Sequence, residues 1–324
     1  MADGTMGNRF TRSNGWKTEN ERIPGFGTTF SIEKALSIVW KPESRWYVAN
    51  PNVKTFTIST ADELEVLAHI VNGTLKEIPM DNFSKKNITL VKNIDLSKYK
   101  NWVPIGDCTS EVHKARYSFY GTFNGTFNGG GYVISNLTIN NHDRNVQGLF
   151  GCVRDGKVEN LGLENVNILG KMAVGGVAGE ISSGSYIFNS YSTGMIKGKA
   201  LVGGIAGEVA YKSVVTDSYS TSAVNCDVAC GGVAGSLNWN SIVNKSYSTG
   251  AISGKLFVGG VAGEVAQFGF ITESYSTSAV SGDEIVGGIA GGNDIYSGVN
   301  NCSAQNSEVK GNKNVGSVTG LKAK

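Results

Sequence analysis

The chain has little proline, little charge and no long hydrophobic run, and each shortage excludes a class of protein. Only 5 of 324 residues are proline and 17% are charged, whereas disordered linkers are usually rich in both. The formal net charge is +2 and no dense cluster of lysine and arginine is present, so we expect no nucleic-acid partner. No stretch of about eighteen apolar residues exists, so we expect no direct membrane insertion.

Histidine is also scarce, which bears on zinc chemistry. Zinc hydrolysis needs two imidazoles on one helical face and a glutamate that activates water. The chain contains only His69, His113 and His142; none is followed by glutamate and no two are four residues apart. We therefore expect no metal, no cofactor and no catalytic residue of this type.

The five cysteines are odd in number and scattered along the chain, and Cys226 and Cys230 lie further apart than in a Cys-x-x-Cys motif. They do not form the pattern of a small disulfide framework, so we predict that they are small apolar residues of the core. The full set is Cys108, Cys152, Cys226, Cys230 and Cys302. Residues 1–12 are polar and lack the apolar core of a signal peptide, which fits a cytosolic protein or a secreted one whose signal is not part of this sequence.

Glycine, in contrast, is abundant, with 44 residues, and it recurs at a fixed period. Gly-x-x-Gly motifs begin every 28 residues, and the motif Ser-Tyr-Ser-Thr keeps the same spacing. Such self-similarity is typical of repeat architectures. The glycine motifs begin at Gly148, Gly176, Gly204, Gly232, Gly260 and Gly288, and the serine motifs span 190–193, 218–221, 246–249 and 274–277.

The residues of one repeat favour strands over helices. Glycine inside a helix costs about 0.5–1 kcal/mol relative to alanine, and each repeat holds several, together with β-branched residues that favour strands. We predict an all-β fold, a parallel β-helix (β-solenoid) of about 28-residue coils. Within one coil we predict three strands, Val174–Glu180, Tyr186–Thr193 and Gly194–Ile196.

Stacked coils place equivalent residues in columns, and three columns are apolar throughout. Together they predict a continuous core that a single coil could not bury alone. The columns are Val174, Val202, Cys230, Val258 and Val286; Ile187, Val215, Val243 and Ile271; and Ile196, Val224, Ile252 and Val280.

The segment before the repeats predicts a lid for the open end of the stack. Thr60 and Glu63 have the spacing of a capping box, and an apolar face follows at Leu64, Leu67, Ala68 and Val71. We predict a short capping helix that ends at Gly73. Less regular strands are predicted at 87–90, 102–105, 119–127 and 132–139. The predicted domains are an irregular extension (1–52), the capping helix with diverged first coils (53–145), and the regular repeats (146–324).

The repeated segments Val174–Gly179 and Asn189–Gly194, with Gly148–Gly151, resemble the GLUG repeat of bacterial surface proteins. The upstream run is similar to the segment that often precedes such repeats, including Trp102–Gly106 and Gly121–Gly125. The resemblance covers about residues 55–320. The family occurs in adhesin-like proteins and in immunoglobulin A peptidases of the zinc metallopeptidase type, so it implies an extracellular or cell-surface location. Those peptidases carry His-Glu-x-x-His in a separate domain, and this sequence lacks that motif.

One candidate ligand-binding surface remains. The small residues Ser190 and Ser192 are expected to face the core, so Tyr191 and Thr193 should face outward. The same pattern predicts an exposed ladder of Tyr191, Tyr219, Tyr247 and Tyr275, flanked by Thr193, Thr221, Thr249 and Thr277. The ladder could bind a glycan or a protein, or it could only stabilise neighbouring strands by about 0.2–1 kcal/mol per pair. If the assignment of inward and outward side chains along this strand were shifted by one residue, the tyrosines would be buried.

Carboxylates also recur, at Glu180, Glu208 and Glu264, in a column interrupted by Ser236 and Gly292. An acid–base pair needs two different environments, and an evenly repeated column offers one. We therefore favour a non-catalytic scaffold or adhesin-like module of a larger surface protein or assembly, which binds a host or microbial glycoprotein or glycan. The alternatives are an immunoglobulin A peptidase-like fragment without its catalytic domain, and a β-helix enzyme that degrades polysaccharides.

Overall fold

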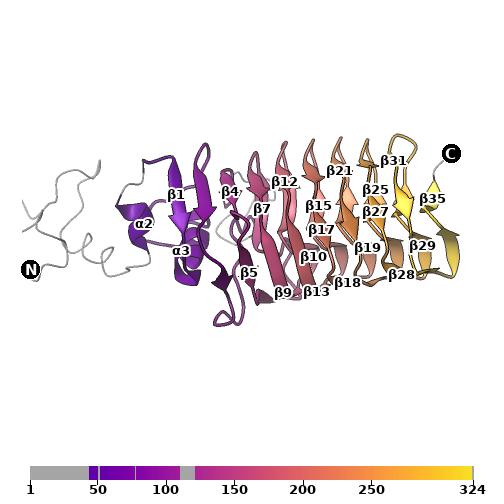
Figure 1. Cartoon of the computed structure of the whole chain (residues 1–324), viewed down its shortest axis with the longest axis horizontal. Coiled ribbons are helices and arrows are strands. Elements are labelled where there is room, and N and C mark those ends of the chain that lie inside the picture. Colours follow the sequence, from indigo (N-terminus) through magenta and orange to yellow (C-terminus); the bar gives the residue numbers. More distant parts are fainter. Residues whose placement is uncertain (1–43, 50–51, 77, 110–120, 323–324) are drawn as a thin grey trace, which may run out of the picture.

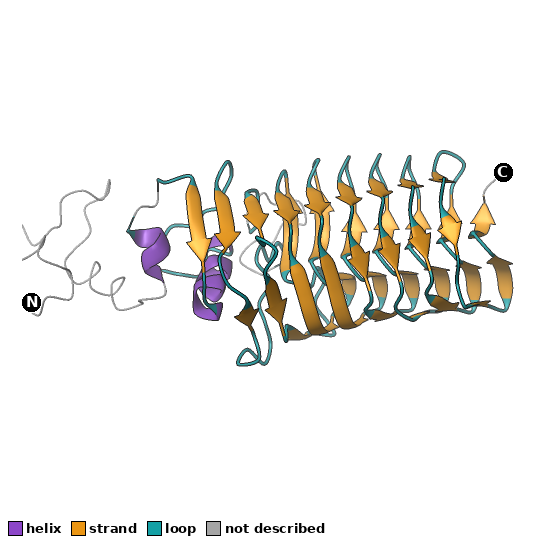
Figure 2. Ribbon diagram, viewed as in Figure 1, coloured by secondary structure: helices purple, strands orange, loops and turns teal. Residues whose placement is uncertain are grey.

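A computed structural model describes residues 44–49, 52–76, 78–109 and 121–322, and it shows a β-solenoid (Figure 1). The strands of successive coils stack side by side along one axis, as Figure 2 shows. Within the described ranges every strand pairing is parallel, and four sheets run along the stack. The predicted fold class is confirmed.

One coil of the regular region contains four strands, not the three that the sequence predicted. They are β10 (Met172–Gly175), β11 (Ala178–Ser182), β12 (Tyr186–Phe188) and β13 (Tyr191–Lys197). The predicted strand Val174–Glu180 is broken at Gly176, where a Cβ would lie 2.6 Å from the carbonyl oxygen of Gly204. The predicted strand Tyr186–Thr193 is broken at Asn189, whose φ of 46° is left-handed. Gly194–Ile196 belongs to β13.

Each of the four sheets is named after the strand that this coil contributes to it. The β12 sheet contains β1 (Thr55–Ile58), β2 (Asn87–Leu90), β4 (Thr126–Asn128), β8 (Lys157–Glu159), β12, β16 (Val214–Thr216), β21 (Ile242–Asn244), β26 (Phe270–Thr272) and β31 (Gly298–Asn300). The β10 sheet contains β10, β14 (Ala200–Gly203), β19 (Val228–Gly231), β24 (Leu256–Gly259), β29 (Glu284–Gly287) and β34 (Lys313–Gly316).

The other two sheets continue the same order. The β11 sheet contains β7 (Phe150–Arg154), β11, β15 (Ala206–Val209), β20 (Ala234–Leu237), β25 (Ala262–Val265), β30 (Ala290–Asn293) and β35 (Thr319–Lys322). The β13 sheet contains β3 (Ile94–Asp95), β5 (Val133–Ser135), β6 (Thr138–Asn140), β9 (Gly162–Leu169), β13, β17 (Tyr219–Ser220), β18 (Ala223–Asn225), β22 (Tyr247–Ser248), β23 (Ile252–Ser253), β27 (Tyr275–Ser276), β28 (Ala279–Ser281), β32 (Ser303–Ala304) and β33 (Glu308–Lys310).

The three predicted apolar columns form the core. Val174 pairs in register with Val202, Ile187 with Val215, and Ile196 with Val224. Every member of the three columns is at most 1% exposed. The 28-residue period therefore places side chains of one type directly above one another, and the repeated apolar positions supply the dry interior.

The predicted capping helix is α3 (Ala61–Val71), beside the first strands of the stack (Figure 1). Thr60 accepts a hydrogen bond from the backbone N–H of Glu63, whose carboxylate accepts one from the backbone N–H of Thr60. Leu64, Leu67, Ala68 and Val71 are buried, as predicted. Gly73, at φ 63°, follows Asn72 at the C-terminal end.

The short helix α2 (Arg45–Val48) adds aromatic rings to this end of the stack. Trp46 and Tyr47 contact Phe56, and all three rings contact Phe83. Phe83 is fully buried and continues the cluster to Phe123. This part of the predicted extension is packed on the first coils, while residues 1–43 and 50–51 lie outside the described residues.

The diverged first strands match the prediction only in part. β2 has the predicted bounds, but 102–105 forms no strand and only Ile105 makes a bridge, to Phe150. The predicted strand 119–127 begins outside the described residues, and β4 covers only its end. The predicted strand 132–139 is divided into β5 and β6 by Asn136, at φ 61°. Because β1, β2 and β4 belong to the β12 sheet, the domain boundary at residue 145 stays a prediction.

Four of the five cysteines form disulfides, which the prediction of small apolar core residues did not include. Cys108 is bonded to Cys152 and Cys226 to Cys230, with Cα–Cα distances of 6.0 and 5.7 Å. Three of the four are buried, as expected of core residues. The first disulfide joins residues that the stacking of diverged coils brings together, and the second spans a corner of one coil. Cys302 is free.

Left-handed residues mark the corners of the coil, and glycine does not occupy most of them. At such φ values an L side chain crowds the backbone, which costs roughly 1–2 kcal/mol. The repeated positions recur in register, so the bend is part of the repeat. One column contains Asp155, Ser183, Tyr211, Trp239 and Gln267; a second contains Asn160, Asn189, Asp217, Lys245, Glu273 and Asn301; a third contains Val146, Ala173, Leu201, Ala229, Phe257, Ile285 and Asn314.

Buried serines satisfy the backbone at these corners. The backbone N–H of Ser190 donates to Oγ of Ser218 at 3.1 Å, and that of Ser218 donates to Oγ of Ser246 at 3.2 Å. The Ser218 hydroxyl itself donates to the carbonyl of Thr216 at 2.9 Å. Each hydroxyl therefore links two coils where the strand ladder is interrupted, and leaves no buried N–H unpaired there.

This serine column predicts a measurable loss of stability. Ser218→Ala removes the acceptor of the buried Ser190 N–H and should lower the free energy of unfolding by about 1–3 kcal/mol. Thr249→Ala, at an exposed position, is the matched control and should change it by less than about 0.5 kcal/mol. Urea unfolding measures both. Equal, small effects of the two substitutions would contradict the role of the serine column.

Candidate functional site

The predicted tyrosine ladder lies on the outer surface of the β13 sheet. Tyr191, Tyr219, Tyr247 and Tyr275 each begin a strand, and they pair in register from coil to coil. The intervening Ser192, Ser220, Ser248 and Ser276 are fully buried. The alternation predicted from the sequence therefore holds, and the rings are half-buried or exposed instead of entering the core.

The four rings stack face to face along the solenoid axis. Their centroids are 5.0, 4.9 and 4.6 Å apart, and the planes of neighbouring rings differ by at most 8°. At the N-terminal end, the ring of Tyr191 lies over Gly162, where a Cβ would approach the ring to 2.7 Å. Ring faces inside the ladder are therefore covered by neighbouring rings, and its edges and hydroxyl groups remain available.

Two of the ladder hydroxyls have perturbed acidities. The Tyr191 hydroxyl donates to the carboxylate of Glu164 at 2.8 Å; burial, followed by this bond, raises the pKa of Tyr191 to about 12. Burial and the neighbouring tyrosines raise the pKa of Tyr247. Both phenols stay protonated at neutral pH. The Tyr191 proton is already donated to Glu164, so of the two it is the Tyr247 hydroxyl that can donate a hydrogen bond to a ligand.

The flanking threonines are less uniform than predicted. Thr221 and Thr249 are exposed, whereas Thr193 and Thr277 are half-buried. The hydroxyl of Thr193 accepts a hydrogen bond from the backbone N–H of Asn165 at 3.1 Å, so it supports the preceding coil. All eight predicted residues thus share one face, and at least Tyr191 and Thr193 have partners within the protein.

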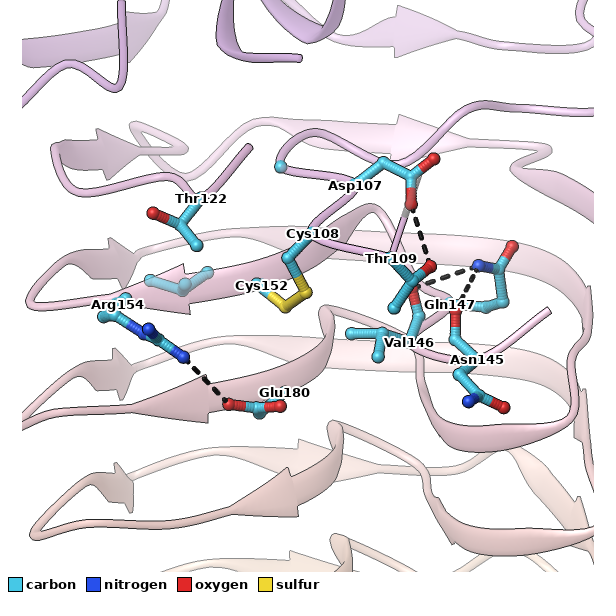
Figure 3. Close-up of a disulfide and its surroundings, with 12 residues drawn as sticks. Asp107, Cys108, Thr109, Thr122, Asn145, Val146, Gln147, Cys152, Arg154 and Glu180 are labelled. Carbon is cyan, nitrogen blue, oxygen red and sulfur yellow. Dashed lines mark hydrogen bonds and ion pairs between the residues drawn. A yellow bond between two sulfur atoms is a disulfide. The ribbon is translucent and has the colours of Figure 1, made fainter. Parts of the chain in front are cut away.

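The glutamate column occupies the β11 sheet, in register as predicted, but its members have different surroundings. Glu180 forms an ion pair with Arg154 at 3.9 Å, close to the Cys108–Cys152 disulfide (Figure 3). Glu208 accepts a hydrogen bond from Asn238 at 3.0 Å. Burial, with the charges of Asp294 and Glu208, raises the pKa of Glu264. The expectation of one repeated environment is therefore wrong.

The histidines occur singly where they are described. His69 lies 4.0 Å from Glu65 and hydrogen-bonds to Thr74, and His142 pairs with Asp143. His113 lies outside the described residues. Among residues 44–49, 52–76, 78–109 and 121–322, no three His, Cys, Asp or Glu side chains are grouped to hold a metal ion. In the same ranges, no helix is long and apolar enough to cross a membrane.

Sequence reasoning missed a second set of outward aromatic side chains, at the turns between the β11 and β12 sheets. Tyr211 stacks on Trp239 with centroids 5.6 Å apart, and Phe268 stacks on Tyr296 at 5.2 Å. These residues do not share one repeat position, so no motif marks them. The available signal was the recurrence of an aromatic residue two or three positions after the end of a Gly-Glu-Val or related strand.

Comparison with known proteins finds similarity to part of one sequence and to the fold of one solved structure. No family model matches the chain, so the resemblance to the GLUG repeat stays a prediction. Halomucin from Haloquadratum walsbyi is 33% identical over 117 residues, which is 33% of this chain and 1% of halomucin. The crystal structure of a candidate immunoglobulin A1 protease from Bacteroides ovatus superimposes with a TM-score of 0.57 over 82% of this chain and 85% of that one. At 17% identity, that likeness shows the fold alone.

The stacking geometry predicts that position within the ladder matters. Tyr247 stacks on two rings and Tyr275 on one tyrosine, and an aromatic pair contributes about 0.5–1.5 kcal/mol beyond its buried area. Tyr247→Ala should therefore reduce the free energy of unfolding by about 0.5–1.5 kcal/mol more than Tyr275→Ala does. Chemical denaturation of both variants measures the difference. Equal losses, or a larger loss for Tyr275→Ala, would rule out a stabilising ladder.

Proposed function

We propose that the chain is a non-catalytic scaffold, an adhesin-like module of a secreted or cell-surface protein. The observation that supports this most strongly is the continuity of the register. Equivalent residues pair 28 positions apart from β12 to β31 in the β12 sheet, and from β7 to β30 in the β11 sheet. Such a stack makes a stiff rod whose outer faces repeat a few side chains, which suits presentation and spacing.

The two disulfides support a location outside the cytosol. Disulfides form and persist in oxidising compartments and are rare in reducing ones. Cys108–Cys152 joins a diverged coil to the first regular strand of the β11 sheet, and Cys226–Cys230 closes a corner in the middle of the stack. Both link segments that already lie side by side, so they would stiffen the rod after it forms.

The stretch similar to halomucin agrees with this placement, since that name marks a mucin-like protein. The chain spans only 1% of halomucin, so membership of a larger surface protein or assembly is part of the proposal. The immunoglobulin A1 protease named for the structural neighbour does not make this chain a peptidase. The likeness supports the fold, and the His-Glu-x-x-His motif is absent from all 324 residues.

The tyrosine ladder, in this proposal, is first a spine that holds the coils in register. Its stacked faces have little room for a ligand, since neighbouring rings lie within 5.0 Å. Binding of a host or microbial glycoprotein or glycan at this face would depend on the hydroxyl edge of Tyr219, Tyr247 and Tyr275 and on the exposed Thr221 and Thr249. Such binding would be governed by hydrogen bonds and would gain little from ring stacking.

Surface labelling combined with disulfide mapping tests the proposal. Intact cells of the source organism are treated with a membrane-impermeant biotin reagent, the chain is captured, and its tryptic peptides are analysed without reduction. We expect labelling before lysis, together with a crosslink between peptides 101–114 and 145–154 and an oxidised Cys226–Cys230 pair within peptide 213–245.

An abundant cytosolic protein is the internal control and should be labelled only after lysis. Labelling of the chain only after lysis, with all its cysteines as free thiols, would overturn the proposal of a secreted or surface module.

A further inference from the structure

The turns between the β11 and β12 sheets carry large aromatic side chains that leave the core. They lie along the edge of the solenoid where each strand of the β12 sheet begins, which includes the loop before β31 in Figure 1. Contiguous exposed apolar groups on a soluble protein mark interaction sites. The exposed fractions are 48% for Tyr211, 45% for Trp239, 49% for Phe268 and 59% for Tyr296.

Backbone strain accompanies this exposure. Tyr211, Trp239 and Phe268 have φ values of 51°, 53° and 66°, which bulky side chains rarely adopt. Ser183 and Gly184 make the same turn one coil earlier with small residues, so the fold itself does not require aromatic side chains there. Strained, exposed aromatic residues that contribute nothing to the core indicate a function at the surface.

A hollow adjoins the N-terminal end of this aromatic edge. Gly125, Gly156 and Gly184, which come just before β4, β8 and β12, line it. A Cβ built on Gly184 would meet no atom within 4 Å, so space is open above it. The other lining residues are Ser84, Lys85, Asn124, Thr126, Asp155, Lys157 and Tyr186.

One tyrosine lines the hollow, and a second lies on the next coil. Tyr186 lines it directly and is 47% exposed. Tyr211 lies one coil further on, and its carbonyl accepts a hydrogen bond from the N–H of Gly184 at 2.8 Å. Trp239 covers one face of the Tyr211 ring, whereas the preceding coil has only Ser183 at the position on the other side. The Tyr211 ring is thus less enclosed than the rings within the tyrosine ladder.

The polar groups of the hollow are mixed in character and nearly balanced in charge. Lys157 is paired with Glu159 at 2.5 Å, and the lining also contains Asp155 and Lys85, one acidic and one basic residue. Asn124, Ser84 and Thr126 supply neutral donors and acceptors. A strongly anionic ligand would find little net positive charge, and an aliphatic chain would find no apolar pocket. A sugar ring, with an apolar face and a rim of hydroxyls, matches the Tyr186 ring beside neutral polar groups.

We propose that this hollow, with Tyr186 and Tyr211, binds a hexose unit of a neutral glycan chain. The rings would cover the C–H faces of the sugar, while Asp155 and Asn124 would hydrogen-bond its hydroxyls. The chain would continue along the aromatic edge toward Trp239. This inference rests on the proposed function of a surface module, and it names the class of ligand and the place where that ligand binds. The site is separate from the tyrosine ladder on the β13 sheet.

Titration with neutral trisaccharides tests the site. Maltotriose, cellotriose and mannotriose are each added to the whole chain, and binding is followed by saturation-transfer NMR and calorimetry. We expect at least one to bind, and both Tyr186→Ala and Tyr211→Ala to weaken it about tenfold. Tyr132→Ala, at an exposed tyrosine outside both the hollow and the ladder, is the control and should leave the affinity unchanged. Tyr275→Ala is measured beside it to detect binding at the ladder. Circular dichroism melts of every variant establish that each is folded.

Three results would overturn the assignment. The first is that no trisaccharide binds at millimolar concentration. The second is binding that is insensitive to Tyr186→Ala and Tyr211→Ala but is lost in Tyr275→Ala, which would place the sugar on the ladder. The third is self-association of the wild type in sedimentation that Tyr211→Ala abolishes, without sugar binding, which would make the edge a protein interface. None of these three results depends on whether the chain reaches the cell surface. The sugar site can therefore be refuted while the proposed surface location stands, and the reverse is also possible.

Discussion

Parallel hydrogen bonding between residues 28 positions apart is the constraint on which the rest of the structure depends. It brings Val174 under Val202 and Tyr191 under Tyr219, so each property of one coil is copied along the axis. Apolar positions become a continuous core, small positions become serine columns, and outward aromatic positions become stacked rings. A single coil has none of these features, because each needs a neighbour in the same register.

The same constraint decides which faces can meet a ligand. Where the aromatic position is kept in successive coils, as in the tyrosine ladder, each ring covers the next and the face becomes part of the framework. Where the repeat is broken, a ring is left less enclosed: Ser183 precedes Tyr211, and Gly184 leaves space beside it. Departures from the repeat are therefore better places to seek recognition than the repeat itself. The hollow is such a place, because the diverged turns at residues 84–85, 124–126 and 155–157 line it.

Much of the fold was predictable because the sequence repeats. The apolar columns follow from a fixed period, and the helix α3 follows from the Thr60–Glu63 capping box with its apolar face. The corners were not predictable, since residues such as Lys245 and Tyr211 adopt left-handed φ values that their chemistry disfavours and that only the neighbouring coils impose. The Cys108–Cys152 bond and the hollow beside Gly184 depend on how the irregular first coils stack. These coils lack a regular repeat, so the sequence did not predict which of their residues would lie side by side.

Hydrogen–deuterium exchange measured peptide by peptide tests the central claim most directly. If successive coils are joined by one register, amides of the strands from β10 to β30 should exchange slowly as a continuous block, and protection should fall only at the turns and toward the last coil. Rapid exchange throughout two or more successive coils inside that block, or a helical circular dichroism spectrum for the intact chain, would contradict it.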